Sequence, residues 1–228
     1  MLAEGYRFRP MRMSRFVLST LLIAVAPLAL AAQTTYPPNS PHATAFKDTS
    51  MLKPPAGHKV AIIEFEDLEC PVCSRAFPVL HAAANQYHVP LEEHDFQIPY
   101  HQWSHEAATF AHYLNAKVSP DLSDQYRREV FASQQRISSK DDLTKFTQAF
   151  MSAHGKQMPF VVDPMFSKEV DESTAMGNRL GVNETPTIIV VTPTRWIQVT
   201  DMMDISQVLN QAQADAMTPT AHHTAAKK

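Results

Sequence analysis

Residues 60–73 read Val-Ala-Ile-Ile-Glu-Phe-Glu-Asp-Leu-Glu-Cys-Pro-Val-Cys. The apolar, mostly β-branched start of this stretch predicts a buried strand, and its end holds Cys70 and Cys73, the only two cysteines of the chain. Pro71 is typical of a first helical turn, where its missing N–H leaves no hydrogen bond unmade and its fixed φ is already helical. Small and apolar residues then recur at helical spacing and predict a helix from about Cys70 to Tyr87; they are Ala76, Leu80, Ala83, Ala84 and Tyr87.

Two cysteines separated by two residues can exchange disulfides, bind a metal or form a structural disulfide. Exchange needs a stabilised thiolate, and a helix N-terminus supplies one through its free N–H groups and its dipole. A structural disulfide over this spacing closes almost no loop and restrains the unfolded chain little. The pattern therefore favours disulfide exchange, with a metal-binding module that uses Cys70, Cys73 and a histidine as the alternative from another class.

A second motif lies far along the chain, at residues 181–191, which read Gly-Val-Asn-Glu-Thr-Pro-Thr-Ile-Ile-Val-Val. Together the two motifs resemble the thioredoxin superfamily and, within it, the exported bacterial DsbA-like thiol-disulfide oxidoreductases, over roughly residues 58–212. The resemblance implies an α/β thioredoxin fold with a helical insertion between the second strand and the cis-Pro loop. It also implies that the bond between Thr185 and Pro186 is cis, that Pro186 faces the cysteines, and that the Thr185 backbone pairs with an extended client.

The resemblance assigns a role to each residue of the predicted site. Cys70 is the nucleophile that forms a mixed disulfide with a client, and Cys73 resolves that intermediate. Glu64 stands six residues before Cys70, where thioredoxin-like proteins place a buried carboxylate. Burial there would raise its pKa and let it exchange a proton with Cys73. The alternative for Glu64 is an outward-facing side chain at the end of a strand. Neither a metal nor an organic cofactor is required.

Val72 departs from the pattern of the strongest oxidants in this family, which have histidine after the proline. Valine offers no donor or charge to a thiolate at Cys70, and the acidic residues Glu66, Asp67 and Glu69 would raise the pKa of a thiol close to them. A less stable thiolate makes a less oxidising disulfide. We therefore expect a weaker oxidant than the histidine-containing relatives, and a disulfide reductase remains the alternative within the same class.

The N-terminal residues predict export. Residues 1–31 hold four arginines and one glutamate, then an apolar run and small residues, which is the order of a signal peptide. A retained anchor is the alternative. Cleavage would take the net charge from −3 to about −6, and nothing in this balance indicates a nucleic-acid partner. An exported chain suits a cysteine pair, because disulfides persist in an oxidising compartment such as the periplasm.

The rest of the chain divides into predicted segments. Residues 32–58 are rich in proline and predict an extended, surface-lying lead, and residues 59–103 and 181–216 form the thioredoxin fold. Residues 104–180 predict the helical insertion, with Ser104 as its first N-cap. Within the thioredoxin fold we expect a second strand over 89–98, an edge strand over 196–200 and a last helix opened by a capping box of Asp204 and Gln207. Residues 217–228 predict a disordered tail.

We therefore predict an exported, monomeric oxidoreductase whose favoured activity is the oxidation of cysteine pairs in secreted polypeptides. The resemblance implies that a membrane partner of DsbB-like or VKOR-like type reoxidises it. A non-catalytic peptide-binding chaperone is a further alternative. His101, His105 and His112 have spacings that would suit a metal on one continuous helix, but Pro99 and Ser104 place His101 before the helix, so solvated histidines are the simpler interpretation.

Overall fold

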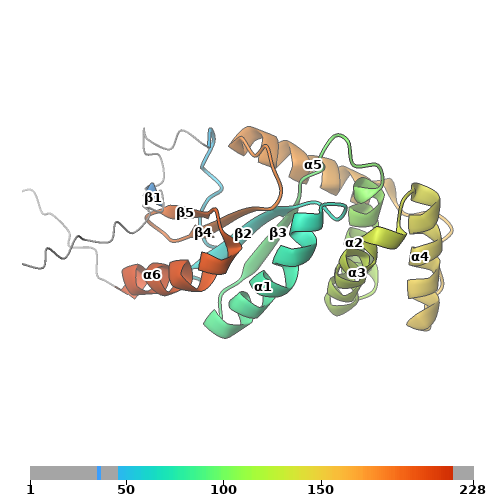
Figure 1. Cartoon of the computed structure of the whole chain (residues 1–228), viewed down its shortest axis with the longest axis horizontal. Coiled ribbons are helices and arrows are strands. Elements are labelled where there is room, and N and C mark those ends of the chain that lie inside the picture. The colour runs from blue at the N-terminus through green and yellow to red at the C-terminus, as the bar shows by residue number, and fades with distance from the viewer. Residues whose placement is uncertain (1–34, 37–45, 218–228) are drawn as a thin grey trace, which may run out of the picture. The chain divides into compact units, whose positions relative to one another are not determined.

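The computed structural model describes residues 35–36 and 46–217 (Figure 1). Its strands are β1 (Thr35–Tyr36), β2 (Ala61–Glu66), β3 (Leu91–Asp95), β4 (Thr187–Val191) and β5 (Trp196–Val199). Its helices are α1 (Pro71–Tyr87), α2 (Ser104–Lys117), α3 (Pro120–Ser133), α4 (Lys140–Ala153), α5 (Pro164–Leu180) and α6 (Ile205–Met217). Short 3-10 turns, η1 (Gln134–Arg136) and η2 (Met202–Asp204), precede α4 and α6.

The strands form one mixed sheet in the order β1-β5-β4-β2-β3. β2 and β3 are parallel, as the crossover through α1 requires, and β4 runs antiparallel to both β2 and β5. All six residues of β2 are buried, which explains why its sequence is apolar on both faces near its start. Phe65 and Glu66 are the last two residues of β2, the most buried strand of the described chain. They directly precede the polar turn that leads to Cys70.

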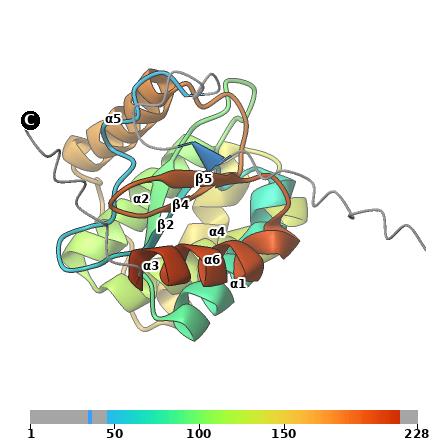
Figure 2. The same cartoon turned by 90° about the vertical axis from the view of Figure 1, so that its left-hand side faces the viewer.

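Period-two alternation assigns the side chains of β2 to two layers. Ile62 packs in a core with Leu80 of α1 and Leu209 of α6, whereas Ile63 and Phe65 belong to a core on the opposite face. Figure 2 shows α1 and α6 together on one side of the sheet and α5 on the other. Since Glu64 and Glu66 share the parity of Ile62, they face the side of the sheet that α1 covers.

Four helices, α2 to α5, lie between β3 and the Thr-Pro loop, so the predicted fold class is confirmed. Their facing side chains build a separate core that continues up to the cysteine motif. This core includes Trp103, Phe110, Leu114, Tyr126, Phe131 and Phe150 together with Cys70, Cys73 and Phe77. The insertion therefore forms one wall of the cysteine site.

Several boundaries differ from the predictions. Trp103 occupies the N-cap position of α2, and Ser104 is its first helical residue, because the chain turns one residue earlier than the capping pattern indicates. β5 is not an edge strand, since β1 pairs with it on the outer side. The N-terminal lead is not only a surface segment, because Phe46 and Leu52 are buried in the core beside α5.

The end of the chain also differs in detail. The cap hydrogen bond before the last helix comes from Asp201, whose carboxylate accepts from the Met203 N–H, so the structure opens this region with the turn η2 rather than with the predicted capping box. Met217 is the last residue of α6 and not the first of a tail. The predicted signal peptide and residues 218–228 lie outside the described residues. No helix in the described part of the chain has the length and hydrophobicity that crossing a bilayer would need.

Candidate functional site

The two cysteines lie at the N-terminus of α1. Cys70 is the N-cap residue, with extended backbone dihedrals, and Pro71 follows as the first helical residue. Cys73, one turn later, is fully buried, whereas Cys70 retains 6% exposure, and both are free thiols. The turn is held by Gln134 of η1, whose amide donates to the Leu68 carbonyl at 2.9 Å and to the Cys70 carbonyl at 3.0 Å. The insertion thus fixes the backbone from which the Cys70 thiol projects.

The loop before β4 brings the second motif against this thiol. The Thr185–Pro186 peptide bond is cis, and the Cys70 thiol donates to the Thr185 carbonyl at 3.3 Å across 115 positions of sequence. A groove of about 550 Å³ opens beside them. Its lining is Cys70, Pro71, Val72, Phe96, Ile98, Pro99, Tyr100, His101, Asn178, Val182, Asn183, Glu184 and Thr185. Apolar side chains such as Val72, Ile98 and Val182 line this groove together with Thr185, and a groove of this kind suits an extended peptide.

The two thiols have opposite acidities. A hydrogen bond from the Cys73 thiol lowers the pKa of Cys70 to about 5, helped by Thr185 and by the N–H groups of Val72 and Cys73 and opposed by burial. Burial raises the pKa of Cys73 far above its ordinary value, and the charges of Cys70 and Glu66 raise it further. At neutral pH Cys70 is therefore a thiolate and Cys73 a thiol, which separates the attacking sulfur from the one that needs a base.

The acidic residues near the motif do not act on Cys70 as the sequence indicated. The Asp67 carboxylate accepts from the N–H groups of Glu69 and Ile98, both at 2.8 Å, and Glu69 accepts from the Trp103 N–H at 2.8 Å. These carboxylates tie the loop after β3 to the cysteine turn. Val72 contributes its backbone N–H to the thiolate even though its side chain cannot.

Glu64 is fully buried beneath the site, and the outward-facing alternative is wrong. Neither of its carboxylate oxygens has a hydrogen-bond partner among the described residues. Burial raises its pKa to about 8, with further contributions from the negative charges of Glu93 and Cys70 and an opposing one from Arg127. A carboxyl that titrates near neutral pH can both take and return a proton, which is the property that general acid–base catalysis needs.

Arg127 of α3 contacts two further buried acidic side chains, Glu66 and Asp95. It donates to Glu66 at 2.7 Å and, through two nitrogens, to both oxygens of Asp95 at 2.9 Å. Burial raises the pKa of Glu66 well above its usual range in spite of its contact with Arg127. Burial would raise the pKa of Asp95, but Arg127 and His112 together hold it well below its usual range. His112 also contacts Glu169 of α5 at 2.8 Å, so this network ties β2 and β3 to three helices of the insertion.

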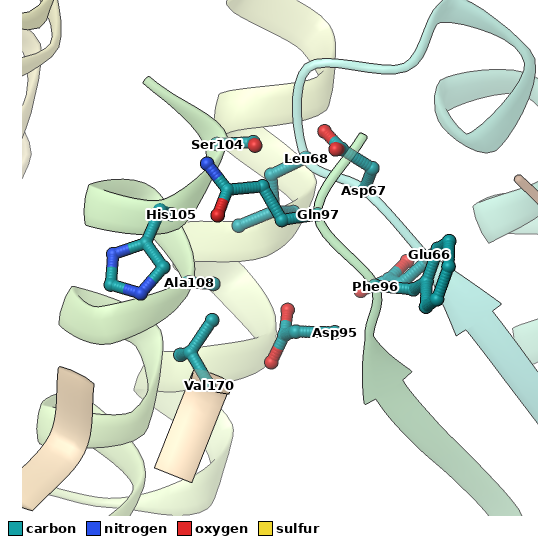
Figure 3. A pocket seen from close by; sticks show the side chains of 10 residues that line it. All are labelled: Glu66, Asp67, Leu68, Asp95, Phe96, Gln97, Ser104, His105, Ala108 and Val170. Carbon is teal, nitrogen blue, oxygen red and sulfur yellow. The ribbon is translucent and has the colours of Figure 1, made fainter. Parts of the chain in front are cut away.

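A small cavity of about 10 Å³ adjoins Glu66 and Asp95, close to the size of one water molecule. Figure 3 shows the Asp95 carboxylate projecting from its strand toward Ala108 and Val170, with Ser104 and His105 at the far side. Glu66 Oε2 and Ser104 Oγ both lack hydrogen-bond partners here. A single water in this cavity would satisfy groups that the protein leaves unpaired.

The three histidines of the hypothetical metal site are not brought together. His101 Nδ1 lies 2.9 Å from Asp67, His105 lies 3.0 Å from Asp171, and His112 is in the network of Arg127. Each of the three histidines contacts a different carboxylate, and no two of them share one.

Sequence reasoning missed Gln134 and Arg127, and also the role of Glu93, which lies directly opposite Glu64 in the parallel register of β2 and β3. In the sequence, a mid-helix arginine and a glutamine after a helix look like ordinary surface residues. Only the structure shows that Arg127 is buried and that Gln134 donates two hydrogen bonds to the cysteine turn. Two glutamates in a short strand, Glu92 and Glu93, were the one available signal, since a strand that is to be buried seldom carries charge.

The fold and the site define a class of protein. A mixed sheet, a Cys-Pro-Val-Cys turn at a helix N-terminus, a facing cis-proline and a four-helix insertion constitute the DsbA-like form of the thioredoxin fold. Solved structures with this architecture include NmDsbA1 from Neisseria meningitidis (18% identity, TM-score 0.51, 72% of this chain and 90% of that one). They also include alpha-DsbA1 of Wolbachia pipientis (16%, 0.57, 72% and 90%) and oxidised BdbD of Bacillus subtilis (11%, 0.50, 76% and 97%).

Residues 55–194 match the family model Thioredoxin_4, described as thioredoxin. This match covers more than half of the chain, which belongs to that family. No curated protein shows significant sequence similarity to it.

Proposed function

We propose that this chain is an exported thiol-disulfide oxidoreductase that oxidises cysteine pairs of secreted polypeptides. The observation that carries the proposal is the contrast between the two thiols: Cys70 is acidic and lies beside a peptide-sized groove, whereas Cys73 is fully buried and its pKa is raised by that burial. The names of the similar structures, which are of DsbA and BdbD type, support the same activity.

The acidity of Cys70 supports the oxidising direction of this proposal. A disulfide is a strong oxidant when its reduced form is stable, and a stabilised thiolate provides that stability. A pKa of about 5 lies between the values of about 7 for thioredoxin and about 3.5 for DsbA. We therefore place the redox potential between those of these two proteins, roughly −270 and −120 mV.

The reaction with a client consists of two exchanges. A client thiolate attacks Cys70 Sγ of the Cys70–Cys73 disulfide, and Cys73 leaves as a thiolate that takes a proton from Glu64. The client's second thiolate then attacks the client sulfur of the mixed disulfide, which expels Cys70 as a stable thiolate and releases the oxidised client. The two electrons and two sulfur–sulfur bonds balance, and the enzyme is left reduced.

Reoxidation reverses these roles. Cys70 thiolate attacks a disulfide of a redox partner, and Cys73, after losing its proton to Glu64, attacks Cys70 Sγ to resolve the mixed disulfide. We propose a membrane protein of DsbB-like or VKOR-like type as that partner, and a monomeric, periplasmic enzyme with a cleaved signal peptide. Cys70, Cys73 and Glu64 are the catalytic residues of this proposal, with Pro71, Val72, Thr185 and Pro186 shaping the site.

The decisive experiment is the redox potential of the Cys70/Cys73 pair at equilibrium with glutathione, read by thiol trapping. A potential well above about −270 mV, together with oxidation of a reduced client peptide, would support the oxidase. A potential at or below that value, with insulin reduction but no client oxidation, would overturn the oxidising direction and leave a reductase. A Cys70→Ala variant that retained full activity would refute disulfide exchange altogether.

A further inference from the structure

The Cys73 thiol of the reduced protein carries a proton that the Cys70–Cys73 disulfide lacks. Glu64, whose pKa burial raises to about 8, is also mainly protonated at neutral pH in the reduced protein, so the buried pair of Cys73 and Glu64 gains a proton from solvent on reduction and loses one on reoxidation. The residue exposure of Glu64 is nevertheless 0%, and no described residue donates to or accepts from its carboxylate. The structure therefore has to contain a path from this carboxyl to the surface, and the following inference rests on the proposed function.

The neighbour of Glu64 on the adjacent strand begins such a path. Glu93 is in register with Glu64 across the parallel pair of β2 and β3, and carboxylate oxygens of Glu64, Glu66 and Glu93 all lie within 4.8 Å of one another. One bridging water or a small side-chain rotation spans this separation. The side chain of Glu93 is 17% exposed, so it reaches toward the surface that Glu64 does not.

The next group along this line is His81 of α1. Its Nε2 lies 3.1 Å from Glu93 Oε1, and its side chain is 24% exposed. Glu93 also lines a polar surface pocket of about 170 Å³ together with Ser123, Asp124 and Arg127. From Glu64 through Glu93 to His81, exposure rises at each step. We propose that Glu93 and His81 form the route by which protons pass between Glu64 and solvent.

The other side of the cluster does not offer an equal route. Glu66 and Asp95 are both held by Arg127, at 2.7 and 2.9 Å, so a proton moving that way would have to pass a fixed positive charge. The same guanidinium explains why we interpret the three glutamates as a proton-holding group rather than a cation site. The cavity beyond Glu66 is large enough for only one water molecule (Figure 3).

The proton balance of the route is simple. When Cys73 attacks the mixed disulfide, its thiol proton goes to Glu64, the Glu64 proton goes to Glu93, and Glu93 passes it through His81 to water. When Cys73 leaves as a thiolate, each transfer runs in reverse. Glu93 and His81 do not touch the reacting sulfurs, so they are positioning residues that act through Glu64.

Any pH dependence of Glu64 depends on the charges around it. Four groups act on it directly: Glu66 on β2, Glu93 on β3, Cys70 on α1 and Arg127 on α3. Four more act through these groups: Asp95 through Glu66, His81 and Asp124 through Glu93, and His112 through Asp95. Of these, Glu93 is the largest single charge acting on Glu64. Replacing Glu93 with glutamine should therefore both block the proposed proton route and lower the pKa of Glu64 by a measurable amount.

The test uses oxidised glutathione and the reduced protein. The first step, attack by Cys70 with release of one glutathione, needs no proton transfer from Cys73. The second step, release of the other glutathione by Cys73, does. We expect Glu93→Gln and His81→Gln to slow the second step by about tenfold at neutral pH and to leave the first unchanged. Glu92→Gln, the same change one residue away on the opposite face of β3, is the matched control and should match wild type in both steps.

Two comparisons separate the route from a structural effect. In a Glu64→Gln background, Glu93→Gln should slow the second step no further, because it acts through Glu64. An equal slowing in both backgrounds, or a wild-type rate in Glu93→Gln, would overturn the route. The carboxyl infrared band of Glu64, assigned by its loss in Glu64→Gln, should titrate about one pH unit lower in Glu93→Gln.

The infrared titration needs no turnover, so the two proposals can fail separately. A wild-type protein that does not react with oxidised glutathione would refute the proposed function. An unchanged Glu64 titration in Glu93→Gln would refute the coupling on which the route depends, whatever the activity.

Discussion

Glu64→Gln is expected to stabilise the reduced protein, and by an amount that grows with pH. Burial is the main cause of the rise in the pKa of Glu64, from an ordinary 4.5 to about 8. Below the lower value the carboxyl is protonated in both the folded and the unfolded chain, so it adds no pH dependence. Above it the unfolded chain ionises while the folded protein keeps its proton, and wild-type stability falls with rising pH until about pH 8.

The size of the effect follows from the two pKa values. Each pKa unit corresponds to 1.36 kcal/mol, so the free energy of unfolding of Glu64→Gln should exceed that of wild type by about 3 kcal/mol at neutral pH and by about 5 kcal/mol near pH 8. Glutamine occupies nearly the same volume and does not titrate, which keeps packing out of the comparison.

Urea unfolding at a series of pH values, with a reductant present, measures this difference. Trp103 and Trp196 are both buried and provide the fluorescence signal. Glu92→Gln, on the opposite face of β3, is the control. Burial also raises the pKa of Glu92, but this side chain is only partly buried, so its difference from wild type should grow less with pH than that of Glu64→Gln. If the difference between Glu64→Gln and wild type were constant from pH 4.5 to about pH 8, the assignment of Glu64 as a base that titrates near neutral pH would be wrong.

The remaining predictions concern three other positions. Val72→His should lower the pKa of Cys70 below about 5, which the ultraviolet absorbance of the thiolate measures. The redox potential should then rise by about 30 mV for each unit by which this pKa falls. An unchanged potential would contradict the link between the acidity of Cys70 and the oxidising power of the disulfide. Arg127→Met removes the positive charge between two buried acidic side chains and should lower the free energy of unfolding by about 3–5 kcal/mol at neutral pH. A urea midpoint equal to that of wild type would instead show that both carboxyls are already neutral. Gly177→Ala would place a Cβ against the buried rings of Phe96 and Phe65, with the nearest Phe65 atom at 3.1 Å. This variant should lower the free energy of unfolding by about 1–3 kcal/mol in urea. An unchanged free energy of unfolding would mean that the two rings can move aside.

Much of the fold could be predicted from local sequence patterns. A β-branched run predicted β2 and helical spacing predicted α1, and the resemblance carried by the cysteine turn and its distant Thr-Pro loop implied the helical insertion between them. The errors lie where a boundary depends on a distant partner. β5 is not the predicted edge strand because β1 pairs with it. Phe46 and Leu52 are not on the surface because their side chains pack in the core beside α5.

The sequence by itself determined that the two cysteines lie one turn apart at a helix start, because a proline after the first of them is a local pattern with a local physical effect. The resemblance to thioredoxin-like proteins also implied a buried carboxylate at Glu64, and the structure buries this side chain fully. Only the tertiary structure decided what surrounds that carboxylate. Glu93, Arg127 and Gln134 come from other elements of the chain, and no spacing along it reports that they converge. Because electrostatic interactions depend on separation in space and on burial, the acidities of the site follow from how the chain folds rather than from the order of its residues.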